Sequence, residues 1–104
     1  MNELALNWLV AQCEGRKVTC YGRALWYDDQ TSATWEWAPA TNWAQGGPII
    51  QREKICTRTD ALGSWTAWLS DGVDYHGPTP LHAAMHCYAA IRGADIQIPL
   101  EFSI

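Results

Sequence analysis

The chain has 104 residues, of which 48% are hydrophobic and 17% are charged, and its formal net charge is -4. This composition predicts one globular domain over residues 1–104 and excludes a disordered chain. The acidic balance argues against nucleic acid as a partner, because sequence-independent binding needs a basic face. No apolar run reaches membrane-spanning length, so we expect no membrane contact.

The tryptophan and cysteine contents bear on assembly and location. Seven tryptophans exceed what the core of one small domain holds, so we expect some of them at a ligand site or at the subunit interface of a homo-oligomer. The N-terminal residues do not form a signal peptide, and the four cysteines contain no C-x-x-C pair. We therefore expect a cytoplasmic protein with reduced thiols.

The first predicted element is a helix over residues 3–14. Asn2 is suited to be its N-cap, and Leu4 and Trp8 fall on one face. Gly15 is placed to end the helix.

Two strands are predicted next. Residues 17–27 favour a strand that Gly22 interrupts as a bulge. Residues 34–38 alternate in the strand period, with Trp35 and Trp37 on one face.

Residues 42–50 read Asn-Trp-Ala-Gln-Gly-Gly-Pro-Ile-Ile and are predicted to form a loop. Gly46 and Gly47 can take positive φ and let another group approach the backbone. Trp43 offers a stacking face, and Gln45 offers a hydrogen-bonding amide. These properties are typical of one half of a binding site.

The following residues, 49–56, fit either a bent strand or an irregular segment. Residues 64–70 predict a further strand. Trp65 and Trp68 differ by three positions, so they should face opposite sides of it.

A second helix is predicted near the C-terminus. Thr79 is suited to be its N-cap and Pro80 its first residue, while Gly93 should stop it after Arg92. Residues 96–102 alternate apolar and polar side chains, which predicts a final strand.

Two segments of this sequence resemble the signatures of the phage NinX-like family. The first is residues 43–50, followed by Arg52 and Glu53, and the second is residues 77–81, which run into the second helix. The resemblance implies an accessory gene product of a tailed phage or prophage that acts in the cytosol of the infected bacterium. It carries over no catalytic residue and no cofactor.

The two segments share a physical property, since both can bind anions. A Gly-Gly loop exposes backbone N–H groups, and the helix N-terminus near Pro80 presents free N–H groups and a positive dipole end. Arg52 could clamp a phosphate, and Trp43 could stack on a base. The predicted ligand-binding residues are Trp43, Gln45, Gly46, Gly47, Arg52, His76, Thr79 and His82. The alternative is that the segments are only a tight turn and a helix entry.

His82 and His86 share a helix face at a spacing that can bind a metal. The three residues between them include no Glu, so the metalloprotease pattern fails. We expect no metal site, no cofactor and no catalytic residues.

Together these patterns predict an α+β fold, with two helices packed on a twisted, mostly antiparallel sheet of four to six short strands. They favour a protein that sequesters a small phosphate-containing, nucleotide-derived host signal without catalysis. One alternative is an interaction protein that inhibits a host protein through a Trp-rich surface, for which Trp35, Trp37 or Trp68 should matter most. The other is an enzyme that acts on a nucleotide.

Overall fold

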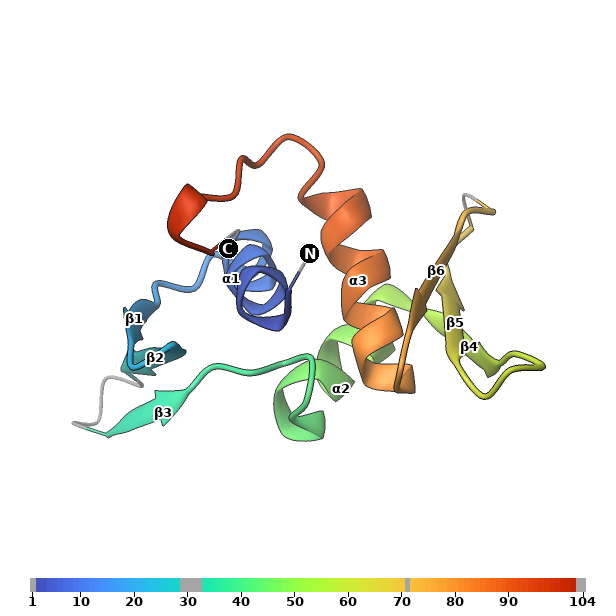
Figure 1. Ribbon diagram of the computed structural model, residues 1–104, viewed down its shortest axis with the longest axis horizontal. Coiled ribbons are helices and arrows are strands. Elements are labelled where there is room, and N and C mark those ends of the chain that lie inside the picture. Colours follow the sequence, from blue (N-terminus) through green and yellow to red (C-terminus); the bar gives the residue numbers. More distant parts are fainter. Residues whose placement is uncertain (1, 29–32, 71, 103–104) are drawn as a thin grey trace.

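Three helices lie between two small sheets in the described part of the chain (Figure 1). The computed structural model describes residues 2–28, 33–70 and 72–102. The elements are α1 (Glu3–Glu14), β1 (Thr19–Tyr21), β2 (Ala24–Asp28), β3 (Thr34–Glu36), α2 (Trp43–Glu53), β4 (Cys56–Thr59), β5 (Trp65–Trp68), β6 (Asp74–Gly77), α3 (Pro80–Arg92) and the 3-10 turn η1 (Leu100–Phe102). The predicted α+β class is confirmed. Two helices on one sheet is wrong, because β1-β2-β3 and β4-β5-β6 are separate antiparallel sheets.

The predicted first helix is confirmed with its caps. The Oδ1 of Asn2 accepts a hydrogen bond from the Ala5 N–H at 2.7 Å, and Gly15 ends the helix with a φ of 70°. Leu6 and Leu9 form part of the buried face of α1. Their burial fixes this helix against the rest of the core.

The turn between β1 and β2 differs from its prediction. Gly22 and Arg23 both have positive φ, 63° and 61°, as a two-residue type I′ hairpin turn requires. Gly22 therefore forms the turn and not a bulge. Leu25 on β2 is 1% exposed and faces the core.

Trp35 and Trp37 end in different environments. β3 stops at Glu36, and the Trp37 N–H donates to the Leu25 carbonyl at 2.7 Å. Trp37 is 4% exposed, whereas Trp35 is 52% exposed on the edge strand β3. One of the two tryptophans is thus a core residue.

The second sheet confirms the opposite orientation of Trp65 and Trp68. Trp65 packs against the core, while the Arg58 guanidinium lies 5.3 Å from the Trp68 ring centroid. α3 covers the inner face of this sheet, where Ala67 is fully buried. Residues 49–56 form the end of α2 and the start of β4.

The predicted loop over residues 42–50 is wrong, because α2 begins at Trp43. Asn42 is the N-cap, and its carbonyl accepts a hydrogen bond from the Gly46 N–H at 2.9 Å. Neither Gly46 nor Gly47 takes positive φ. The Gly-Gly pair is therefore part of a helix and not an open turn.

The predicted C-terminal strand is also wrong. Residues 96–102 end in the turn η1, in which the Phe102 N–H donates to the Pro99 carbonyl at 3.0 Å. Phe102 is buried against Trp8, with ring centroids 5.6 Å apart. Ile96 and Ile98 also pack on the core, whereas Leu100 is exposed, and Pro99 has no N–H for a sheet ladder.

Candidate binding site

The two signature segments meet in space at the beginning of α2 and α3. A Cβ atom added to Gly46 would lie 2.5 Å from the Cδ1 of Leu81 and would also overlap the Pro39 carbonyl oxygen. Only glycine allows α2 to approach α3 this closely. The sequence left open whether the two segments meet, and the structure brings them together through helix packing and not through an open pocket.

Gln45 holds the approach to α2 through both ends of its side-chain amide. Its Oε1 accepts a hydrogen bond from the Ala38 N–H, and its Nε2 donates to the Glu36 carbonyl, each at 2.7 Å. This clamp satisfies backbone groups between β3 and α2. Because both ends of the Gln45 amide bond to the backbone, this side chain stabilises the fold and is not placed to bind a ligand.

Polar side chains cap both helices. The Thr79 Oγ1 accepts a hydrogen bond from the His82 N–H at 3.0 Å, which confirms Thr79 as the N-cap of α3. The Asn42 Oδ1 accepts from the Ala44 N–H at 2.9 Å. What the two helices offer a ligand is the remaining N–H groups of their first turns and their positive dipole ends.

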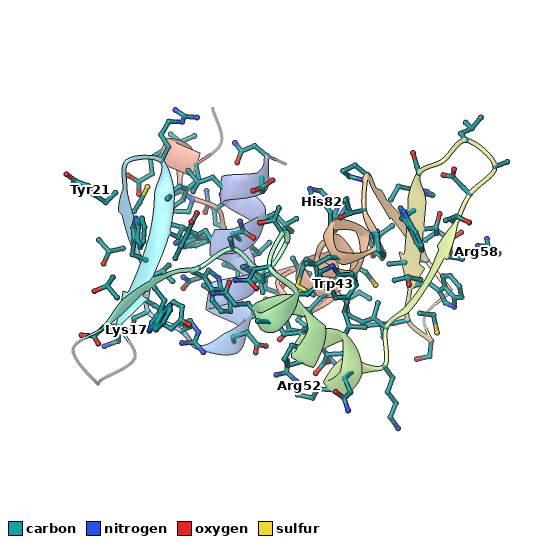
Figure 2. The ribbon with its side chains drawn as sticks, turned by 90° about the horizontal axis from the view of Figure 1, so that it is seen from below. Lys17, Tyr21, Trp43, Arg52, Arg58 and His82 are labelled. Atoms are coloured by element: carbon teal, nitrogen blue, oxygen red, sulfur yellow. The ribbon has the colours of Figure 1, made fainter. Side chains whose placement is uncertain are left out.

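Trp43 is the large exposed side chain at this place, with 57% of its surface accessible. A Cβ on Gly47 would be 3.7 Å from the Trp43 Cε3, so the indole lies over this glycine. Figure 2 shows Trp43 beside the beginning of α3, which is seen nearly end-on. The indole is therefore available for stacking where the two helices start.

Arg52 does not share this site. It lies nine residues after Trp43, about 14 Å along the helix axis. Its guanidinium donates two hydrogen bonds to the Glu14 carboxylate, the Nη1–Oε1 distance being 3.0 Å, and further ones to Glu53 at 2.8 Å and to the Tyr88 hydroxyl at 3.2 Å. The network joins the C-terminal ends of α1 and α2 to Tyr88 of α3, and Glu53 also pairs with Arg92 at the end of α3.

The same network changes the acidity of its members. Hydrogen bonds from Arg52 hold the pKa of Glu14 below its ordinary value, while burial and Glu14 raise the pKa of Tyr88. Glu14 is thus a carboxylate that the fold stabilises in its charged form.

We expect Glu14→Gln to lower the free energy of unfolding by about 1 kcal/mol at neutral pH, a value reduced from that of a buried pair because Arg52 is half exposed. Since folding lowers the pKa of Glu14 below 4.5, its stabilisation is complete above that pH and is lost as the pH falls through the folded value. Urea unfolding at pH 7 and pH 3 measures this difference. Asp95→Asn, which removes an exposed carboxylate, is the control. Equal losses at both pH values would contradict the assignment.

The histidines face separate neighbours. The Nδ1 of His76 is 3.1 Å from the Thr66 Oγ1 on the outer face of the second sheet. The Nδ1 of His82 is buried behind Gly77 and has no partner among the described residues, and burial lowers the pKa of this ring. His86 donates to the His76 carbonyl at 3.3 Å. Within residues 2–28, 33–70 and 72–102, no three His, Cys, Asp or Glu side chains gather as metal ligands.

A cavity of about 280 Å³ between α1 and the first sheet escaped the sequence reasoning. Its charged residues, Glu3, Arg23 and Glu36, come from three separate segments that no motif links. The one available signal was the Gly22-Arg23 pair, which suits a tight hairpin turn.

The chain matches a known protein family. A model of the family described as Bacteriophage P22, NinX matches residues 1–92. A search of curated proteins finds no match. None of the helices in the described ranges is both long and apolar enough to cross a membrane.

Proposed function

This chain belongs to the bacteriophage NinX family, and from that premise we propose that it is a non-catalytic binding protein whose site is the surface around Trp43. Its ligand would be a small nucleotide-derived molecule that carries a planar ring and phosphate. The observation that carries the proposal is the exposed indole beside the first turns of two helices.

The ring of the ligand would stack on Trp43. An exposed indole on a helix start presents a rigid aromatic surface at small entropic cost, and stacking of a base on such a ring contributes about 1–3 kcal/mol.

The phosphate would lie against the helix starts. The contact of Gly46 with Leu81 brings the first turns of α2 and α3 together, so their positive dipole ends act on the same region. Arg52 cannot assist there, because Glu14 holds it at the far end of α2. The helix starts alone would therefore bind the anion.

The polar side chains near Trp43 support binding without turnover. The side chains of Gln45 and Thr79 form hydrogen bonds with backbone groups. Burial lowers the pKa of His82 and so favours its neutral form. A nucleophile needs an adjacent base and an orienting group. Sequestration of a host signal by a phage protein would fit this set of residues, and the phage context supplies the host by association only.

A second candidate is an interaction protein that docks on a host protein, or on a second copy of this chain. Its support is that Tyr21 and Trp35 are 79% and 52% exposed on the first sheet. Exposed aromatic side chains are frequent anchors of protein interfaces. The same exposed aromatic side chains are the support for a homo-oligomer. The apolar last strand, which was the other reason to expect one, is not formed.

We expect a saturable change in tryptophan fluorescence when the protein is titrated with a panel of linear and cyclic nucleotides and ADP-ribose derivatives. Binding without catalysis predicts that the bound molecule is recovered chemically intact. Trp43→Ala should weaken binding by roughly tenfold to a hundredfold, the loss of one stacked base, whereas Trp35→Ala should not change it.

Each other outcome is decisive. A chemically altered ligand would make the protein an enzyme. No response to any member of the panel would overturn the nucleotide proposal and leave the protein-partner candidate.

A further inference from the structure

The floor of the cavity between α1 and the first sheet is formed by buried apolar side chains. Leu25 and Trp37 are buried beneath it, at 1% and 4% exposure. The Trp37 Nε1–H donates to the Asn7 carbonyl at 2.8 Å, and the Asn7 Oδ1 accepts from the Ala40 N–H at 3.0 Å. These bonds tie the floor to α1, so the cavity belongs to the rigid part of the fold.

Three charged side chains line the same cavity, and all are exposed: Glu3, Arg23 and Glu36. None of them forms an ion pair with any residue of the described ranges. The two carboxylates and the guanidinium are therefore all available to pair with charged groups of a ligand.

Their backbone positions are fixed by different devices. Arg23 projects from the type I′ turn with a φ of 61°, a backbone conformation that few non-glycine residues adopt. Glu36 ends β3, and its carbonyl is held by Gln45. Glu3 is the first residue of α1.

We propose that this cavity binds a small zwitterion. Its primary ammonium group would lie between Glu3 and Glu36, and its carboxylate or phosphate would pair with the Arg23 guanidinium. The volume of about 280 Å³ suits an amino-acid-sized molecule. The site is separate from the surface around Trp43 and does not depend on its function.

Calorimetric titration with four probes tests the proposal: β-alanine, O-phosphoethanolamine, methylammonium and inorganic phosphate. At least one of the two zwitterions should bind about tenfold or more tightly than either single-charge probe, since only a zwitterion satisfies both signs. The ratio between β-alanine and O-phosphoethanolamine identifies the anionic group.

The matched variants are Arg23→Asn and Lys54→Asn. Both residues are exposed cations with positive φ, 61° and 58°, and asparagine tolerates that conformation. Arg23→Asn should weaken zwitterion binding about tenfold, while Lys54→Asn should leave it unchanged. Thermal unfolding of both variants checks that they fold.

Two results would overturn the proposal. One is a zwitterion affinity no higher than that of methylammonium or phosphate alone. The other is an Arg23→Asn protein that folds and binds the zwitterion as tightly as the Lys54→Asn control.

Discussion

Replacement of Gly46 by alanine should lower the free energy of unfolding by about 3 kcal/mol, near the upper end of the usual cost of overpacking. The added methyl group would overlap the Pro39 carbonyl oxygen and the Leu81 side chain, 2.5 Å from its Cδ1. The Pro39 oxygen is backbone and cannot turn away as a side chain does. α2 would have to move off α3, and urea unfolding would record the loss.

Gly47→Ala is the matched control one residue along the same helix. Apart from its chain neighbours, its new Cβ would meet the Trp43 ring, at an ordinary 3.7 Å. Alanine favours a helix over glycine, but its Cβ is disfavoured in a helix directly before Pro48, so this variant should change stability by less than about 1 kcal/mol. Equal effects of the two substitutions would show that the helices are not packed through Gly46.

Trp37→Ala should cost about 4 kcal/mol, since it empties a large buried site. The indole is 4% exposed, donates to the Asn7 carbonyl and packs edge-on against Tyr27 with ring centroids 5.8 Å apart. The Arg16 guanidinium also lies 4.9 Å from its ring centroid. Thermal or urea unfolding measures the effect.

Trp35→Ala provides the comparison two residues earlier. Half exposed on the edge strand β3, Trp35 should contribute less than about 1 kcal/mol to stability. A Trp37→Ala protein as stable as Trp35→Ala would contradict the assignment of Trp37 to the core. The pair also revises the interaction-protein alternative, in which Trp37 can no longer be a contact residue.

Elements with strong local signals could be predicted from the sequence. Asn2 and Gly15 delimit α1, and Thr79, Pro80 and Gly93 delimit α3, because capping chemistry acts within a few residues. Two separate sheets were beyond prediction, since short strands do not reveal their partners.

α2 could not be predicted because its local propensity is poor. Two glycines and Pro48 disfavour a helix interior. The Gln45 clamp and the contact of Gly46 with Leu81 are tertiary interactions, and they override that preference. The features that resembled an open binding loop are those that allow close helix packing.

The sequence could not show whether the two signature segments meet, because their distance in space depends on tertiary packing. The two signature segments do meet, and Trp43 is exposed there. Arg52 was assigned to the same site because it is close in sequence, but a helix carries it about 14 Å away to Glu14. Sequence proximity to a glycine pair would have meant spatial proximity only in a loop.

A ¹⁵N–¹H spectrum of the seven indole N–H groups, recorded with ADP-ribose and with cyclic nucleotides, tests the central claim most directly. Binding at the start of α2 and α3 predicts that one of these ligands shifts the Trp43 resonance, assigned from Trp43→Phe, while the buried Trp37 stays in place. Shifts that bypass Trp43, or none with any ligand, would contradict it.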